Sequence, residues 1–322
     1  MSRYARQIAL AEVGEEGQRR IAGAHVLVVG AGGLGSPVIE YLAGAGVKRM
    51  ILVDPDHVEE SNLHRQTLYR MSDIGRSKVS AARDHIAAAN PAVSVETWFG
   101  AVHPGNADGL VAGADVVVDA ADSFAVSYIL SDACMRTPRP LISGSALGFT
   151  GYVGGFCGGA PSLRAVFPDL PSSGATCASS GVMGPVVGMI GALQAQMVLQ
   201  ILLGIAPSPL GRLTRCDMTA LRFGGFVFDG APEPRVSLPF VSRADLLPDD
   251  QVVELRSMED APDAVSAEAL RTRPEEVTDI GVVSGRRVVL CCATGLRAWR
   301  AAERLRQVGH DDLALLAMSA SG

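Results

Sequence analysis

The sequence has little that marks a membrane-spanning or secreted protein. Its 322 residues contain no uninterrupted apolar run of about 18 residues, the length that a membrane helix requires. The first residues, MSRYARQ, lack the apolar core of a signal peptide, and so we expect a cytoplasmic protein with no membrane partner. The longest apolar stretch, residues 181–205, is interrupted by Gln194, Gln196 and Gln200. We interpret it as a buried core helix or a dimer-interface helix.

Positive charge is also scarce. The net charge is −6, and Lys and Arg do not cluster with interleaved aromatic residues, so we expect no nucleic-acid partner. The cysteines follow no regular spacing, and in a cytosolic protein each is expected to be a reduced, buried, small hydrophobic residue. They are Cys134, Cys157, Cys177, Cys216, Cys291 and Cys292.

The length of the chain favours two domains. The hydrophobic content of 48% and the 36 glycines are typical of an α/β protein with many tight turns. A proline-rich segment, FDGAPEPRVSLPF, predicts a boundary. We therefore expect one domain over residues 1–229, a linker over 230–240 and a second domain over 241–322.

A glycine-rich turn organises the first domain. The run HVLVVGAGGLGS is a strand that breaks at Gly30, Gly32 and Gly35 and restarts as a helix. A second strand, RMILVD, ends at Asp54, where a ribose is commonly bound. This pattern predicts a Rossmann-like, mostly parallel sheet with helices on both faces, and a nucleotide at the sheet edge. On its own it also fits an NAD-dependent oxidoreductase.

The residues that follow Asp54 favour ATP over NAD. Two amides, Asn62 and Gln66, and two cations, Arg65 and Lys78, lie just beyond it. Hydride transfer leaves such groups without a role, whereas cleavage of a triphosphate moves negative charge onto the leaving pyrophosphate and needs fixed donors.

Asp122 has two interpretations. It follows the strand-like run ADVVVDAA and directly precedes a predicted helix, so it would cap that helix. It also lies at the carboxyl edge of the sheet, where it would hold the magnesium ion that bridges triphosphate oxygens. The presence of Arg65 and Lys78 favours the magnesium role.

Several motifs together resemble the ThiF/MoeB/HesA family, whose members are similar to the adenylation half of ubiquitin-activating enzymes. They are RYARQ, GAGGLGSP, DPDHVEESNLHRQ, DIGRSK, ADSF and GVMGPVVGMIGALQA, in order between Arg3 and Phe226. The resemblance implies ATP-dependent adenylation of the C-terminal glycine of a small ubiquitin-like sulfur carrier ending in Gly-Gly. The activated carrier would then accept sulfur for thiamine or molybdenum-cofactor biosynthesis.

The resemblance also implies roles for individual residues. The glycine turn would approach the nucleotide, Asp54 would hold the ribose and Asp122 the magnesium. Arg6 would reach the partner's phosphates across a homodimer interface, although a solvated, frayed terminus is the alternative. The ATP-binding set is Gly30, Gly32, Gly33, Gly35, Asp54, Asn62, Arg65, Gln66, Lys78 and Asp122.

Residues 162–185 are rich in Pro, Ser and Gly, which predicts a mobile loop over the nucleotide site. Cys177 lies in this loop. Family members often carry a cysteine here that bonds covalently to the carrier or its sulfur; the alternative is an incidental loop thiol.

The sequence departs from the family at the positions of two C-x-x-C pairs, which hold a structural zinc in many members. The first pair would fall on Ser162 and Ala165 and the second near Pro232 and Arg235, so no zinc is predicted. ADSF also replaces the usual Thr-Asp-Asn-Phe, and Ser127 stands where an arginine is often found.

The second domain contains a cysteine at a strand end. Strand-like runs QVVELRS and RRVVLCC are followed by the arginine-rich helix GLRAWRAAERLRQVG. Cys292 precedes the helix N-terminus, whose N–H groups would stabilise a thiolate or persulfide. The loop from Cys292 to Arg297 resembles the C-x-x-G-x-R loop of rhodanese-like sulfurtransferases, with Arg297 shaping it. Cys291 should face the opposite side of the strand.

This second resemblance implies a small α/β rhodanese-like domain that takes sulfur from a donor such as a cysteine desulfurase. The usual Gly-His-Ile-Pro-Gly stretch is missing and the chain ends early, so a truncated, structural remnant is the alternative. For the whole chain, the alternatives are a non-catalytic adenylation-fold scaffold and a family member that activates a different carboxylate.

Overall fold

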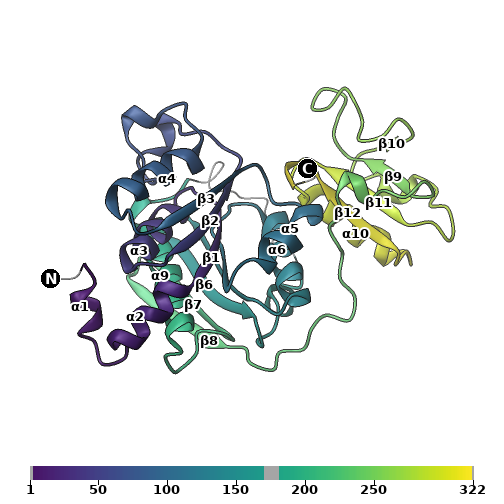
Figure 1. Ribbon diagram of the computed structural model, residues 1–322. Helices are drawn as coiled ribbons and strands as arrows, with labels where there is room; N and C mark the ends of the chain where they lie inside the picture. The colour runs from purple at the N-terminus through teal and green to yellow at the C-terminus, as the bar shows by residue number, and fades with distance from the viewer. Residues whose placement is uncertain (1–2, 170–180, 321–322) are drawn as a thin grey trace.

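The structure is a computed structural model that describes residues 3–169 and 181–320. Two sheets organise it (Figure 1). The larger has eight strands in the order β3-β2-β1-β4-β5-β6-β7-β8, and the smaller has four in the order β10-β9-β11-β12. The first five strands of the larger sheet pair in parallel, and helices cover both of its faces. The predicted α/β fold with a mostly parallel sheet is confirmed.

The parallel half of the large sheet contains the predicted glycine turn. Because β1 pairs with both β2 and β4, the strand order reverses beside it, which is where open α/β sheets form a crevice. The strands are β1 (His25–Val29), β2 (Arg49–Asp54), β3 (Ser94–Phe99), β4 (Val116–Asp119) and β5 (Pro140–Leu147). The connecting helices are α3 (Gly35–Ala45), α4 (Lys78–Ala89), α5 (Pro104–Ala112) and α6 (Phe124–Arg136).

The other half of the sheet is antiparallel. The predicted hairpin is formed by β5 and β6 (Thr150–Cys157), and two strands that the sequence did not predict, β7 (Arg212–Asp217) and β8 (Arg222–Val227), extend it. Every residue of β8, the edge strand of the sheet, is exposed. The short helix α7 (Leu163–Val166) follows β6.

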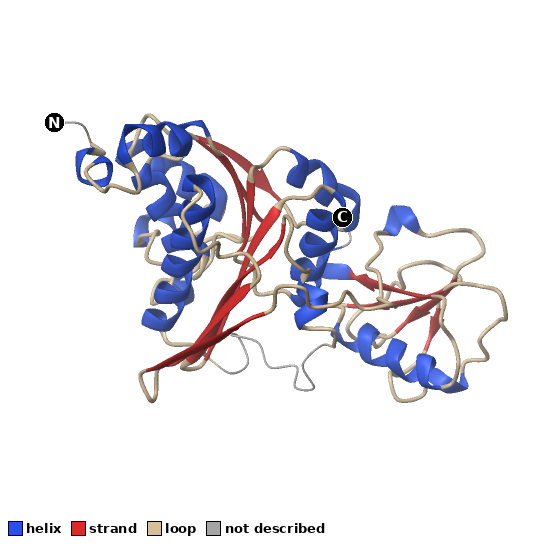
Figure 2. Ribbon diagram, turned by 90° about the horizontal axis from the view of Figure 1, so that it is seen from below, coloured by secondary structure: helices blue, strands red, loops and turns tan. Residues whose placement is uncertain are grey.

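Helices α3, α4 and α9 (Gly184–Leu203) cover one face of the large sheet, and α5 and α6 cover the other (Figure 2). Among the described residues, α9 alone is long and apolar enough to span a membrane, and 44% of its apolar window is buried. Its buried side chains, such as Ile190 and Val198, belong to the core shared with α3, β5 and β6. Part of α9 thus lies in the core, as predicted, and the alternative of a dimer-interface helix stays a prediction.

The N-terminal segment is helical. Helix α1 (Ala5–Ile8) and helix α2 (Gly14–Gly23) lie at one end of the sheet, and α2 packs against α9. The Tyr4 hydroxyl accepts a hydrogen bond from the Asn90 amide at 2.9 Å. The segment is thus helical and anchored through Tyr4, while the side chains of Arg3 and Arg6 are exposed, as the solvated alternative expects.

The small sheet is parallel. Strand β11 pairs with β9 and β12, and α10 packs on both β11 and β12. The segments predicted as strands over QVVELRS and RRVVLCC and the arginine-rich helix are all present. The elements are β9 (Gln251–Glu254), β10 (Leu270–Arg271), β11 (Val288–Cys292), β12 (Leu313–Ala317) and α10 (Leu296–Gln307). The described residues also form single helical turns, which are η1 (Glu60–Asn62), η2 (Met71–Asp73), η3 (Arg243–Asp245), η4 (Val277–Asp279) and η5 (Met318–Ala320).

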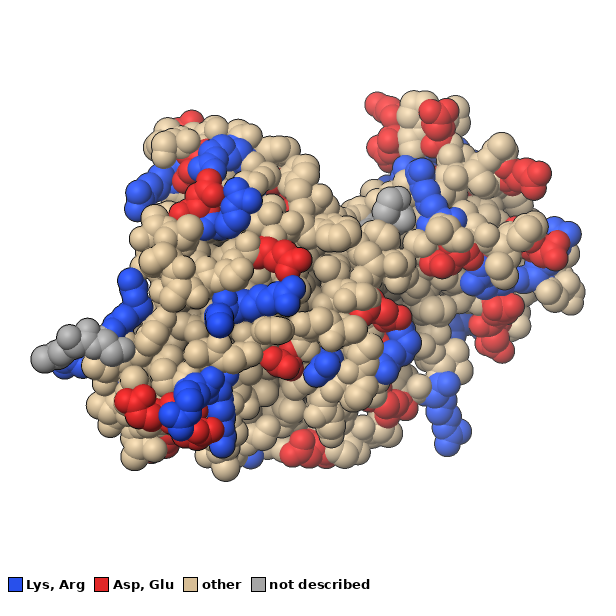
Figure 3. All heavy atoms as spheres, in the orientation of Figure 1, with Lys and Arg blue, Asp and Glu red and all other residues tan. Residues whose placement is uncertain are grey.

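The segment between the two sheets is held at both ends. The Ser162 N–H and hydroxyl donate to the carboxylate of Glu233, and Phe240 forms a bridge with Leu315 of β12. The boundaries predicted for the two domains stay a prediction, although β8 ends before residues 230–240 and β9 begins after them. Figure 3 shows acidic and basic side chains interspersed over the visible face.

Candidate nucleotide site and cysteine loop

The turn after β1 is built so that only glycine fits at two positions. Gly30 has a φ of +96°, and a Cβ there would lie 2.5 Å from the carbonyl oxygen of Ala120. A Cβ on Gly35 would lie 2.0 Å from the carbonyl oxygen of Gly30. Gly32 is different, since a Cβ there would meet only the Gln66 amide, at 3.5 Å. The turn therefore lies between the ends of β2 and β4 with its Gly32 side open.

Asp54 is fixed beside this turn. Its carboxylate is buried at the end of β2 and accepts the backbone N–H of Ala31 at 2.7 Å and that of Asp56 at 2.8 Å. Burial raises the pKa of Asp54, and the nearby charge of Lys78 opposes this rise. The Tyr69 hydroxyl donates to the Ala31 carbonyl at 2.7 Å, which holds the turn from its other side. The Asp54 carboxylate is thus fixed in position at the end of β2.

The predicted cations and amides gather on the same side. Lys78 is the first residue of α4, is 5% exposed, and its Nζ lies 2.8 Å from the carboxylate of Asp56. A Cβ on Gly33 would lie 3.5 Å from Cγ of Arg65. Gln66 is 3% exposed and its Oε1 has no hydrogen-bond partner among the described residues. A buried acceptor without a donor beside an open glycine turn is suited to a bound molecule.

Asn62 supports this arrangement from the turn η1. Its carbonyl oxygen accepts the backbone N–H groups of both Arg65 and Gln66 at 3.0 Å. The Arg65 guanidinium binds the Ser61 carbonyl at 3.2 Å and lies 2.7 Å from Nε2 of His64. The Arg65 guanidinium is therefore held on its own turn and has no carboxylate partner among the described residues.

Two carboxylates lie at the carboxyl end of β4, of which Asp119 is its last residue and Asp122 follows three residues later. Asp119 is fully buried and accepts the Ser143 hydroxyl at 2.7 Å, and burial raises its pKa to about 6. Asp122 is exposed and makes no hydrogen bond or ion pair with the residues that the structure describes. The N-cap position of the next helix, α6, is Ser123 rather than Asp122. Asp122 is therefore available to a ligand.

The described residues contain no group of three or more His, Cys, Asp or Glu side chains placed to hold a metal ion. Magnesium in nucleotide sites is usually held by one or two carboxylates together with phosphate oxygens. The unengaged carboxylate of Asp122, across β1 from Asp54, fits that pattern.

Arg6 is not part of this chain's own site. It is exposed on α1, which Tyr4 holds against Gly46 at the C-terminal end of α3. The glycine turn is at the other end of this 11-residue helix, about 16 Å away along its axis.

A groove lies on the antiparallel half of the large sheet, lined by residues of β5 to β8. It has a volume of about 750 Å³. Its residue Ser145 is two positions from Ser143 on β5, so both side chains lie on the same face of the strand. Residues that line it include Ser145, Tyr152, Phe167, Arg215, Phe223 and Phe226.

The cysteine loop of the small sheet has the predicted geometry. Cys292 is the last residue of β11, and its Sγ accepts the N–H groups of Gly295 at 3.1 Å and Ala298 at 3.3 Å. The Arg297 guanidinium lies 3.4 Å from the Leu255 carbonyl. Cys291 packs on the opposite face, as predicted, and burial raises its pKa to about 12. Cys177 lies outside the described residues.

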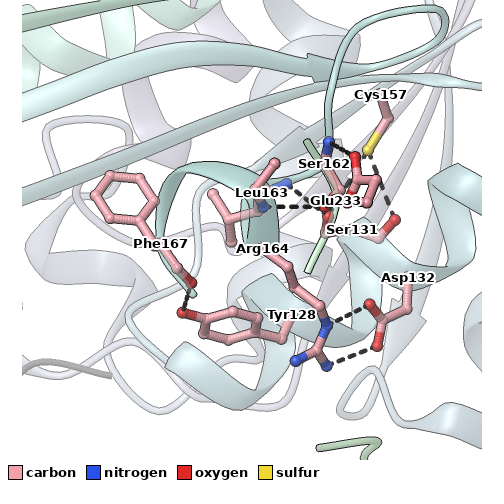
Figure 4. Close-up of polar contacts among 10 residues, drawn as sticks. Tyr128, Ser131, Asp132, Cys157, Ser162, Leu163, Arg164, Phe167 and Glu233 are labelled. Atoms are coloured by element: carbon pink, nitrogen blue, oxygen red, sulfur yellow. Dashed lines mark hydrogen bonds and ion pairs between the residues drawn. The ribbon is translucent and has the colours of Figure 1, made fainter. Parts of the chain in front are cut away.

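The segments where the family's zinc ligands would fall are joined by a different contact (Figure 4). Ser162 donates its N–H and hydroxyl to Glu233 at 2.7 and 2.5 Å. The positions Ala165, Pro232 and Arg235 flank this contact. A serine–carboxylate pair therefore joins the two segments.

Two groups of site residues were not identified from the sequence. Asp56 pairs with Lys78, and the Asp-x-Asp pattern of residues 54–56 was the available signal. The groove residues of β7 and β8 had none, because those strands were not predicted.

Residues 4–233 match the ThiF family. The SAMP-activating enzyme E1 of Haloferax volcanii is 40% identical over 225 residues, which cover 69% of this chain and 83% of the relative. The sulfur carrier protein adenylyltransferase of Thermus thermophilus is 41% identical over 231 residues, 69% of this chain and 85% of the relative. The adenylyltransferase and sulfurtransferase MOCS3 of Bos taurus is 46% identical over 218 residues, but they span only 48% of its length.

Solved structures show the same fold. The Escherichia coli MccB complex with AMPCPP and MccA superposes with a TM-score of 0.64 at 22% identity, covering 72% of this chain and 73% of the other. The MccB complex with ATP gives a TM-score of 0.61 at 21% identity, covering 71% and 72%.

Proposed function

The chain belongs to the ThiF family, and we propose that it adenylates the C-terminal glycine of a small ubiquitin-like sulfur carrier with ATP. The observation that carries this proposal is the grouping of the Lys78, Arg65 and Gln66 side chains, with the Gln66 amide nitrogen beside the open Gly32 side of the glycine turn. The names of the H. volcanii and T. thermophilus relatives support the same activity.

The reaction starts from the ionised carboxylate of the carrier. One of its oxygens attacks the α-phosphorus of ATP and forms a new P–O bond, while the bond to the bridging oxygen breaks and pyrophosphate leaves. No general base is required, because an α-carboxyl group with a pKa of about 3.5 is already ionised at neutral pH. The acyl-adenylate that forms has a good leaving group, and sulfur can then attack its carbonyl carbon.

The chain's own residues have three tasks in this step. Asp54 binds the ribose, and the backbone around Gly32 approaches the phosphates. Lys78, Arg65, Asn62 and Gln66 donate to the triphosphate and to the pyrophosphate that leaves. The Asp54 carboxylate is already held by the backbone N–H groups of Ala31 and Asp56 in the nucleotide-free structure, so this part of the site needs little reorganisation.

Asp122 would hold magnesium together with the nucleotide. The ion, when bound, neutralises triphosphate oxygens. The buried Asp119 and its hydrogen bond from Ser143 fix the strand end from which Asp122 projects.

The groove along β5 to β8 is the proposed path of the carrier tail. It begins on the face of β5 that bears Ser143 and continues past Tyr152 to Phe223 and Phe226. An extended Gly-Gly tail is narrow enough for such a path, and the exposed apolar side chains of β8 suit a folded carrier domain.

We also propose a homodimer in the cytoplasm, in which Arg6 of each subunit reaches the other's phosphates. The location of Arg6 outside its own site supports this. Cys177 would form a covalent bond with the activated carrier.

Cys292 would carry sulfane sulfur from a donor such as a cysteine desulfurase, and the sulfur would serve thiamine or molybdenum-cofactor synthesis. The two N–H groups that donate to Cys292 Sγ support its role as the sulfur carrier.

ATP–pyrophosphate exchange tests the function. The wild-type chain should exchange label in the presence of its carrier, and a carrier without its last two glycines should not support exchange. Arg65→Ala and Asp122→Ala should abolish exchange. Exchange that ignores the glycines would remove the proposed substrate, and calorimetric binding of NAD in place of Mg-ATP would remove the proposed chemistry.

A further inference from the structure

Asp56 is held rigidly between the ribose carboxylate and the start of α4. Its N–H donates to Asp54 Oδ1 at 2.8 Å, and its carbonyl accepts the backbone N–H of Lys78 at 2.9 Å. The Val58 N–H donates to the Arg76 carbonyl at 2.8 Å, so residues 56–58 pair with residues 76–78 through backbone hydrogen bonds. None of these bonds uses the Asp56 side chain.

The Asp56 side chain is used only for Lys78. Its Oδ2 lies 2.8 Å from Lys78 Nζ, and no other ion pair engages Lys78 in the part of the chain that the structure describes. The environments of the two partners differ sharply, since the lysine side chain is 6% exposed and the aspartate side chain 64%. Asp54 is a second anion near Lys78, but its two oxygens each accept a backbone N–H, and the direct ion pair of Lys78 is with Asp56.

We infer that Asp56 is a positioning residue that pairs with Lys78 in the nucleotide-free site. The ion pair breaks when Lys78 binds the triphosphate and forms again as pyrophosphate leaves. This inference rests on the proposed function. A buried ammonium without a counter-ion is costly, so the empty site needs an anion beside Lys78. The triphosphate and the Asp56 carboxylate therefore compete for the ammonium group of Lys78. Because Asp56 is mostly exposed, water can solvate its carboxylate once Lys78 has turned to the phosphate.

The predicted consequence is a separation of binding from turnover. In Asp56→Asn the backbone bonds persist, but the competing charge is gone. ATP and pyrophosphate should both bind more tightly, by about fivefold for an ion pair with one exposed partner. The turnover number of ATP–pyrophosphate exchange should fall, because pyrophosphate is released more slowly.

Calorimetry with Mg-ATP and with pyrophosphate, together with exchange kinetics, tests this. Asp84→Asn is the matched control, since it removes the same charge from an exposed residue of α4 that pairs with Arg76 and Arg83. The control should leave both affinities unchanged. Asp56→Glu keeps the charge and should restore affinities within twofold of wild type, and equal melting temperatures would show that the fold is intact.

Unchanged or weaker binding of ATP by Asp56→Asn would overturn the inference, because Asp56 would then be structural or a direct ligand. Failure of Asp56→Glu to restore wild-type affinity would overturn it too. If the wild-type chain itself binds no Mg-ATP, the proposed function fails first, and that result is distinct from either of these.

Discussion

The guanidinium carbon of Arg164 lies 5.9 Å from the ring centre of Trp299, although Arg164 follows the large sheet's β6 and Trp299 lies in α10 on the small sheet. Arg164 also lies 4.8 Å from the ring centre of Tyr128 and forms a two-bond ion pair with Asp132 (Figure 4). The two sheets are thus joined by side-chain contacts as well as by the connecting segment.

Arg164→Ala should loosen this contact. The Arg164 side chain is 6% exposed, and removing it leaves Asp132 unpaired beside Tyr128 and Trp299. We expect a loss of about 2 to 3 kcal/mol in the free energy of unfolding, measured by urea denaturation. Trypsin should also cleave faster after Arg235, in the segment between the sheets.

Arg136→Ala is the matched control. Arg136 makes the same kind of pair with Asp108, but both side chains are more than half exposed. It should cost less than about 1 kcal/mol. Equal losses for the two variants would show that Arg164 does not stabilise the contact between the sheets.

The glycines of the turn should separate into structural and functional positions. Gly35→Ala drives a methyl group into the Gly30 carbonyl and should prevent folding or lower the melting temperature strongly. Gly32→Ala meets only the flexible Gln66 amide, so the melting temperature should stay near wild type while the Kd for ATP rises at least about tenfold. Tight ATP binding by Gly32→Ala would mean that the phosphates do not approach this side.

Asp119 should make stability depend on pH. Folding raises its pKa from 3.8 to about 6 because the carboxyl is buried, so between these values the native state holds a proton that the unfolded state has lost. Its contribution is therefore present below about pH 4 and is lost as pH rises to 7. Asp119→Asn should gain up to about 3 kcal/mol relative to wild type over that range.

Urea denaturation of both proteins at several pH values measures this difference. Other groups titrate equally in both proteins and cancel. A difference that stays constant from pH 4 to 7 would contradict the prediction.

The two adjacent cysteines should differ in reactivity toward a sulfur donor. Cys292 accepts two backbone N–H groups, whereas burial raises the pKa of Cys291 to about 12. Mass spectrometry after incubation with thiosulfate should find a persulfide that Cys292→Ser abolishes and Cys291→Ser retains. Both variants should keep ATP–pyrophosphate exchange, and loss of exchange in Cys292→Ser would contradict this separation of roles.

The sequence predicted the parts of the fold that local patterns encode. The glycine spacing after β1 and the acidic residues at strand ends locate the sheet edge, because a turn and a strand end are properties of a few neighbouring residues. Strand β8 has no such pattern, since all six of its residues are exposed and the alternation of buried and exposed positions is missing.

Contacts between distant residues lay beyond sequence reasoning. The pair of Asp56 with Lys78 depends on how residues 56–58 meet residues 76–78. The contact of Tyr128 with Trp299 depends on how the second sheet lies against α6. Periodicity and spacing carry no information on either.

Gln194 links the long helix α9 to the candidate nucleotide site through a hydrogen bond. Its buried amide donates to the Asp119 carbonyl at 2.6 Å, at the point where β4 ends. A displacement of α9 would therefore act on the strand end from which Asp122 projects. The position of α9 and the position of the Asp122 carboxylate are therefore coupled through this hydrogen bond.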